Sequence, residues 1–215
     1  MGLAHFKHTD FLDAARALAA ELGPAGVTVD LVNERLKAPK GSFYYRFASR
    51  DLLLGELWLT AALAYQEGFV AAIEAGDGLK AALHMPAWVR LNLDDARLLL
   101  LYSRHDFVQG EWPLPLKKAV VDQARRFETC LERFAREALG SAKAENIRVA
   151  QFVLADVPMA AVRPHLRRRE APPLLIDELI RDTYRAIVDK DRAPPSRGLR
   201  KGAASPARRD RKSVV

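Results

Sequence analysis

Apolar residues recur at helical spacing along almost the whole of this 215-residue chain, and no other feature constrains its fold as much. Apolar residues three or four positions apart lie on one face of an α-helix, whereas a half-buried strand alternates apolar and polar residues. Alternating runs bounded by turn residues are absent. Since 49% of the residues are apolar, the chain can close a core in one or two compact domains. We therefore expect an all-α fold of about nine helices.

Three short helices are predicted near the N-terminus, where capping and stop residues mark their ends. Thr9 is suited to cap the first helix, and Gly23 followed by Pro24 ends it. Thr28 is suited to cap the second helix, which ends before Pro39 because a proline disfavours helical geometry in the residue ahead of it. The third helix begins at Pro39, since proline is tolerated in a first helical turn.

The third predicted helix has a basic, hydroxyl-rich face. Phe43 and Phe47, four residues apart, share its other side and are expected in the core. Between Arg35 and Arg50 the sequence has five basic residues and no acidic one. Such a face suits DNA phosphates and base edges, the alternative being a solvated surface. The residues expected nearer to solvent are Lys40, Ser42, Tyr44, Tyr45 and Arg46.

The net charge of +7 comes from the C-terminal tail. Residues 192–215 contain eight basic residues and one acidic residue, so the rest of the chain is neutral. The tail is rich in Pro, Gly, Ser and Ala, and we expect residues 191–215 to be disordered because they cannot form a core. The tail either adds unspecific attraction to DNA phosphates or is a solvated end.

Several classes of protein are disfavoured by what the sequence lacks. Its longest uncharged stretch, residues 57–66, is far shorter than the roughly 20 apolar residues of a membrane-spanning helix, and its start has no apolar signal core. The lone Cys130 can form neither an internal disulfide nor a cysteine-based zinc site, and His5 and His8 have no further ligands nearby. Common catalytic and nucleotide-binding motifs are absent. We expect a cytoplasmic protein that is not an enzyme and that binds no metal, no cofactor and no membrane.

A run of specific residues marks the N-terminal quarter. It opens with Leu12-Asp13-Ala14-Ala15, closes its first helix at Gly23, starts its second at Thr28-Val29 and continues into residues 40–53, KGSFYYRFASRDLL. With these elements residues 11–53 resemble the amino-terminal DNA-binding domain of the TetR (tetracycline repressor) family. Four positions around the turn between the second and third helices depart from the family pattern: Asn33, Lys37, Ala38 and Pro39.

The resemblance implies a homodimer whose third helices enter successive major grooves of a near-palindromic, double-stranded DNA operator. The resemblance implies that Thr28, Tyr44 and Arg50 bind phosphates. It implies that the other DNA-binding residues contact bases or their flanking backbone. It also implies a DNA-binding domain over residues 1–50 and an effector-binding and dimerisation domain over residues 51–190. The predicted DNA-binding residues are Thr28, Pro39, Lys40, Gly41, Ser42, Tyr44, Tyr45 and Arg50.

The second domain is predicted to be helical throughout. A long helix over residues 51–75 connects it to the first domain. Pro86 and Pro158 are expected to kink their helices. The last two helices carry apolar residues on more than one face, so we expect them to form the dimer interface, unless they complete the monomer core. The predicted helices after residue 75 span 79–93, 95–107, 115–139, 142–162 and 173–188.

Unusual residues of the middle helices are candidates for lining an effector pocket. Aromatic rings with a few polar groups are typical of such cavities, although each of these residues is alternatively a core residue. Arg104 could bind a carboxylate or lie at a helix end. The candidates are His84, Trp88, Tyr102, Arg104, Phe107, Trp112, Phe127 and Phe152.

The sequence as a whole predicts a TetR-like transcriptional regulator, a repressor that an unknown small-molecule effector releases from its operator. Two alternatives stay open. One is a DNA-binding protein without an effector, and the other is a helical carrier or enzyme whose helix-turn-helix domain is vestigial.

Overall fold

The computed structural model describes residues 6–107 and 112–190, except the side chains of Lys40, Arg104 and His105. The predicted tail, residues 191–215, and His5 lie outside these residues. The described residues contain helices and turns and no strand, which confirms the all-α prediction. The helices are α1 (His8–Leu22), α2 (Val29–Leu36), α3 (Arg50–Glu74), α4 (Gly78–Leu91), α5 (Leu93–Leu101), α6 (Arg104–Phe107), α7 (Leu114–Ala138), α8 (Ala144–Gln151), α9 (Val157–Arg167) and α10 (Leu175–Val188). Shorter elements are the 3₁₀ turns η1 (Pro24–Gly26) and η2 (Lys40–Ser42) and the π-helical turn η3 (Phe152–Asp156).

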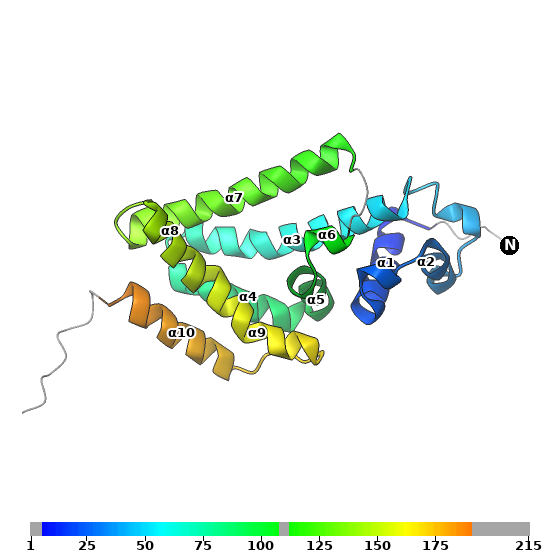
Figure 1. The fold of residues 1–215 in the computed structure, drawn as a ribbon. Coiled ribbons are helices and arrows are strands. Elements are labelled where there is room, and N and C mark those ends of the chain that lie inside the picture. Colours follow the sequence, from blue (N-terminus) through cyan, green and yellow to red (C-terminus); the bar gives the residue numbers. More distant parts are fainter. Residues whose placement is uncertain (1–5, 108–111, 191–215) are drawn as a thin grey trace, which may run out of the picture.

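The long helix α3 organises the molecule, as Figure 1 shows. Helices α1 and α2 lie at its N-terminal end, and α4 and α7 pack along the remainder. We call α1, α2 and residues 37–49 the head, and the helices from α4 to α10 the body. Helix α1 also contacts α5, so the head touches the body directly as well as through α3.

Local capping explains most helix ends in the head. The Leu31 N–H donates to Thr28 Oγ1 over 3.2 Å, so Thr28 caps α2 as predicted. Gly23 ends α1 with a φ of 77°, which also agrees with the prediction. The prediction of Thr9 as the first cap was wrong, because α1 begins at His8 and its N-cap is Lys7, two residues before Thr9. The Lys7 N–H donates instead to the Asp10 carboxylate over 2.7 Å.

The third helix is shorter than predicted. Only η2 is helical, and turns follow it to Arg46. A single backbone bond of helical spacing, from the Phe47 N–H to the Phe43 carbonyl over 2.9 Å, closes the segment. Gly41 and the aromatic residues that follow it favour helices weakly, and a segment of this length relies on packing and not on propensity.

Two irregularities shape the body. The predicted helix 95–107 breaks after Leu101, because Asp106 accepts hydrogen bonds from the Ser103 N–H and hydroxyl and closes a new turn. Pro158 lacks the N–H that would bond to the preceding turn, and η3 lies just ahead of it in a helix that runs on from α8 into α9. The irregularity expected at Pro158 is therefore present as a π-helical turn.

Two apolar clusters form the interior. The head cluster contains Phe11, Phe43 and Phe47 and takes in Leu98 and Phe107 from the body. The body cluster lies between α3, α4, α7, η3 and α10. None of the described helices is long and apolar enough to cross a membrane. Among the described residues no group of three or more histidine, cysteine or acidic side chains could hold a metal ion.

Candidate nucleic-acid interface

The segment after α2 presents tyrosines on one side and anchors itself with phenylalanines on the other. Phe43 and Phe47 are fully buried, whereas Tyr44 is 63% exposed and Tyr45 87% exposed. No atom lies within 4 Å of the place where a Cβ on Gly41 would stand, so the backbone there is open to an approaching partner. The segment therefore exposes hydroxyl groups and backbone beside the exposed cap of α2, Thr28.

The turn that leads into this segment contains a strained residue. Lys37 has a φ of 54° and a ψ of 35°, the left-handed conformation that favours glycine. The Ala38 N–H donates to the Asn33 carbonyl over 2.9 Å and holds the turn closed. The departure from the family pattern at Lys37 is thus accommodated without changing the type of helix end.

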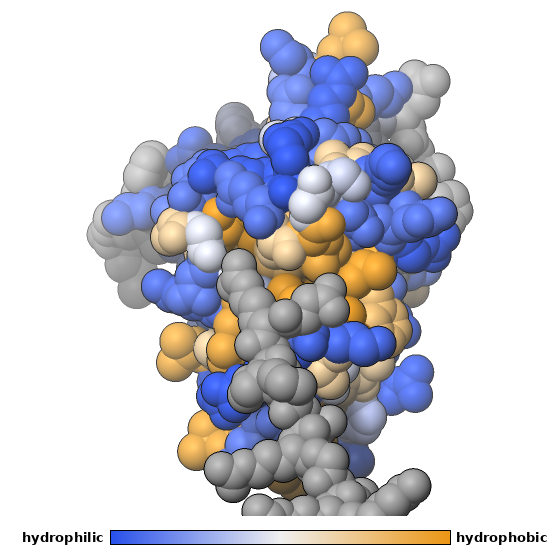
Figure 2. Space-filling model, turned by 90° about the vertical axis from the view of Figure 1, so that its left-hand side faces the viewer, coloured by the Kyte–Doolittle hydropathy of each residue, from blue (hydrophilic) through white to orange (hydrophobic). Residues whose placement is uncertain are grey.

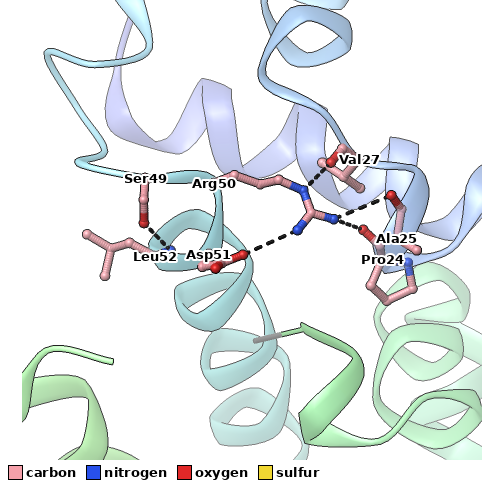
Figure 3. A network of polar contacts seen from close by, with 7 residues as sticks. All are labelled: Pro24, Ala25, Val27, Ser49, Arg50, Asp51 and Leu52. Carbon is pink, nitrogen blue, oxygen red and sulfur yellow. Dashed lines mark hydrogen bonds and ion pairs between the residues drawn. The ribbon is translucent and has the colours of Figure 1, made fainter. Parts of the chain in front are cut away.

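Arg50 is held inside the protein, as Figure 3 shows. Its guanidinium donates to the Pro24 carbonyl over 2.7 Å and to the Val27 carbonyl over 2.5 Å. It also lies 3.2 Å from the carboxylate of Asp51. These bonds tie the start of α3 to residues 24–27, which directly precede the cap Thr28. The phosphate contact that the resemblance implies for Arg50 stays a prediction, and the structure adds that these bonds fix the residues just before α2.

Two further side chains that the sequence analysis left without a role in DNA binding fix the exposed segment. The His8 ring stacks on Phe47 with ring centroids 4.2 Å apart, and its Nε2 lies 2.8 Å from the Glu56 carboxylate. Arg46 donates to the Phe6 carbonyl over 3.0 and 3.2 Å. Phe6 and His8 thus pack against the segment. Helical spacing gave no sign of this, because the partners are about 40 residues apart.

The predicted effector-pocket residues do not form one group. His84, Trp88 and Phe127 lie in the body cluster or against it. Tyr102, Phe107 and Trp112 belong to the head cluster or pack against it, because the chain turns after Leu101. Phe152 is exposed, and the side chain of Arg104 lies outside the described residues. The structure therefore does not bring the candidates together into one cavity, and which of them line an effector pocket stays a prediction.

The body cluster contains polar atoms that stay unpaired. Tyr65 is 8% exposed and Gln66 is 1% exposed. Within the described residues the Tyr65 hydroxyl and Gln66 Oε1 have no hydrogen-bond partner, while Gln66 Nε2 donates to the Gln123 carbonyl of α7 over 2.8 Å. The sequence did carry a signal, since Gln66 lies on the apolar stripe of α3 four residues after Ala62 and three before Phe69.

The His84 side chain of α4 packs against α3 at Tyr65 and Gly68. Its Nε2 is 2.7 Å from the Tyr65 carbonyl, and a Cβ on Gly68 would lie 2.3 Å from its ring. Desolvation lowers the pKa of the His84 imidazole and raises the pKa of the Tyr65 hydroxyl. The core between α3, α4 and α7 is therefore an aromatic environment in which uncharged polar groups are favoured.

The surface formed by η3 and α10 exposes large apolar side chains. Phe152 of η3 and Leu174, Leu175 and Leu179 at α10 are all exposed, although α10 also buries Ile180 in the core. Figure 2 shows hydrophobic side chains gathered between hydrophilic ones on this end of the molecule. Exposed leucines this close together are typical of an interface between proteins.

Comparison with known proteins agrees with this architecture. Residues 11–57 match the family model of bacterial regulatory proteins, tetR family. A transcriptional regulator of the TerR/AcrR family from Aquifex aeolicus VF5 is 16% identical, covers 84% of this chain and 98% of its own, and has a TM-score of 0.57. A structure classed as a tetR family transcription regulator from Shewanella sp. PV-4 is 18% identical, covers 86% and 98%, and has a TM-score of 0.61. No curated protein matches the sequence.

The head thus matches the tetR family model, and the head together with the helical body has a fold similar to those of the two regulator structures. The family-model match lies in this part of the chain and confirms the resemblance to the tetR family read from residues 11–53.

Proposed function

We propose that the protein is a dimeric repressor that binds an operator through its heads and leaves it when a small molecule enters the body. The observation that carries the proposal is the exposed segment after α2, with Tyr44, Tyr45 and Gly41 facing outward over a buried phenylalanine anchor. A surface of hydroxyls and open backbone, backed by a rigid core, suits insertion into a DNA groove.

The DNA-contacting residues divide into two groups. Thr28, at the N-terminus of α2, and Tyr44 bind phosphates through their hydroxyls and the helix end. Lys40, Ser42 and Tyr45 face the bases, with Pro39 starting the segment and Gly41 allowing close approach. Arg50 acts through its carbonyl partners, because its bonds fix where Thr28 lies.

The dimer forms through α10 and the helix that runs from α8 to α9. The exposed leucines of α10 support this assignment, since water would otherwise cover them. The Leu179→Glu substitution is expected to leave a monomer in light scattering after size-exclusion chromatography. Leu114→Glu is the matched control, because Leu114 is 80% exposed on α7, outside this surface, and the dimer should persist.

The effector enters the core between α3, α4 and α7. The unpaired Tyr65 hydroxyl and Gln66 Oε1 support this position, because a ligand that bonds to them supplies hydrogen bonds that the described residues do not. This observation favours an effector-controlled regulator over a DNA-binding protein without an effector. Induction requires that the effector bind the DNA-incompetent spacing of the heads more tightly than the competent one.

Selection of bound fragments from a random duplex library, at near-physiological salt, tests the proposal. The full chain and a chain that ends before Arg192 are compared, because the tail adds basic residues. An enriched palindrome that survives removal of the tail is expected. Tyr44→Phe should weaken all sequences about equally, and Lys40→Ala should change which sequence is preferred. No enrichment, or binding that depends on the tail, would overturn the proposal in favour of a carrier or enzyme.

A further inference from the structure

A second place for a ligand lies where the head meets the body. A cavity of about 340 Å³ is walled by α1 and α5 and by side chains from α2 and from the turn after α9. It is distinct from the core around Tyr65. Five charged residues line it: Glu21, Arg35, Asp94, Arg97 and Arg169.

Arg97 of α5 carries a buried charge that no carboxylate balances. The residue is 7% exposed, and its guanidinium donates to two backbone carbonyls, those of Leu166 at the end of α9 and of Ala20 in α1. Among the described residues its Nε has no hydrogen-bond partner and no acidic group forms an ion pair with its guanidinium. Buried charges are ordinarily paired with an opposite charge, so the Arg97 guanidinium is a candidate to bind an anion.

Arg169 approaches the same cavity in a strained conformation. Its φ of 59° lies in the left-handed region, which an arginine adopts only where its surroundings hold it. Its Nη2 donates to the Glu21 carbonyl at the end of α1 over 2.8 Å. The turn after α9 is thus held against the head by an arginine.

Arg35 supplies the cation on the head side. It forms a two-pronged ion pair with the Glu21 carboxylate, with nitrogen-to-oxygen distances of 2.8 and 3.2 Å. Glu21 is therefore already engaged by Arg35. Asp94 is the other carboxylate of the lining. Three guanidiniums therefore face two carboxylates, and the lining keeps an excess of positive charge.

We propose that this cavity binds a small organic anion whose carboxylate or phosphate group compensates Arg97 and Arg169. Its volume is near the lower limit of small-molecule sites, so the ligand is a compact one. An anion held there would bridge Arg35 of the head to Arg97 and Arg169 of the body. It would therefore fix the head in the orientation that the structure shows. This regulatory consequence rests on the proposed function, whereas the binding does not.

Calorimetric titration of the full chain tests the binding. The probes are inorganic phosphate and succinate at constant ionic strength, with sodium chloride as the control for unspecific charge. We expect saturable binding of at least one probe, with one site per chain. Phosphate alone, succinate alone or both would distinguish a phosphate-bearing from a carboxylate-bearing ligand. Heats no larger than those of chloride for both probes would overturn the proposal.

Variants decide whether the anion binds in this cavity. Arg169→Gln and Arg35→Gln should each weaken binding at least tenfold. Arg167→Gln removes the same charge two residues from Arg169 but outside the lining, and should change the affinity less than twofold. Equal weakening by all three would mean a general effect of charge and overturn the site.

Arg97→Met gives a second, independent readout. It removes the cation that the anion would compensate, so the anion should no longer raise the melting temperature of the variant, whereas it should raise that of the unsubstituted protein. If this variant does not fold, Arg169→Gln and Arg35→Gln still decide the question. Neither experiment uses DNA, so a failure to find an operator leaves this result standing, and the reverse also holds.

Discussion

The head and the body bury their aromatic side chains in different ways. In the head, Phe11, Phe43 and Phe47 pack ring against ring, with centroids 5.7 to 6.3 Å apart. In the body, Tyr65 packs with its ring against His84 and Trp88, but its hydroxyl has no partner in the described residues. One cluster is apolar and interlocked, and the other includes buried polar atoms whose hydrogen bonds are missing.

This difference indicates where the protein can change at the lowest energetic cost. An interlocked phenylalanine cluster has one good packing arrangement, so the head is expected to move as a rigid unit. A buried polar atom without a partner costs about 1–3 kcal/mol. Any ligand or rearrangement that pairs it recovers part of that cost. Under the proposed function, the body is thus the part expected to respond to a ligand, and the head the part expected to change position.

The largest expected effect comes from breaking the apolar cluster. Phe43→Ala removes a fully buried ring and should lower the free energy of unfolding by about 3–5 kcal/mol. Urea unfolding followed by circular dichroism measures it. Tyr45→Ala, next but one in sequence and 87% exposed, is the control and should change stability by no more than about 0.5 kcal/mol. A small loss for Phe43→Ala would mean that the head tolerates repacking.

Arg50→Ala tests whether the head depends on polar ties as well as on packing. The substitution leaves the Pro24 and Val27 carbonyls without their charged donor, and stability should fall by about 1.5–3 kcal/mol. Operator affinity should fall as well, measured as a function of salt. If Arg50 positions α2, the salt dependence keeps its slope. A slope reduced by about 1 would show a phosphate contact and restore the role that the resemblance implied.

Exchanging a single hydroxyl sharpens the contrast between the two cores. Tyr65→Phe removes an unpaired hydroxyl from the body and should leave stability unchanged or raise it by about 1 kcal/mol. Phe43→Tyr places an unpaired hydroxyl in the head and should lower stability by about 1–3 kcal/mol. Thermal unfolding of both variants measures whether each substitution raises or lowers the stability. If both substitutions destabilise equally, the two cores are equally specific and the contrast fails.

The sequence predicted features that depend on near neighbours. Thr28 as a cap and Gly23 as a stop follow from bonds within four residues, and the long amphipathic helix α7 begins and ends one residue from its predicted bounds. The shortness of the third helix was not predicted. Its conformation is held by packing of Phe43 and Phe47 and not by its own propensity.

Contacts between distant residues were out of reach of the sequence. Arg50 bonds to carbonyls 23 and 26 residues earlier, and Arg97 bonds to carbonyls 69 residues later and 77 residues earlier. Every residue has a backbone carbonyl, so the residue type does not indicate which carbonyl accepts such a hydrogen bond. The aromatic residues are divided between two cores because the chain turns at Ser103, and the helical periodicity of the sequence did not predict this turn.

The smallest effect concerns the turn at Lys37, where the head departs from an unstrained geometry. Lys37→Gly removes the Cβ that the φ of 54° disfavours, and stability should rise by about 0.5–1 kcal/mol, measured by urea unfolding. Lys37→Ala removes the same charge but keeps a Cβ, so it should show no such gain. If glycine and alanine gave equal stability, the left-handed residue would not be a source of strain. A gain confined to glycine would mean that the rigid head contains one strained position, at the turn that sets the angle of the DNA-facing segment.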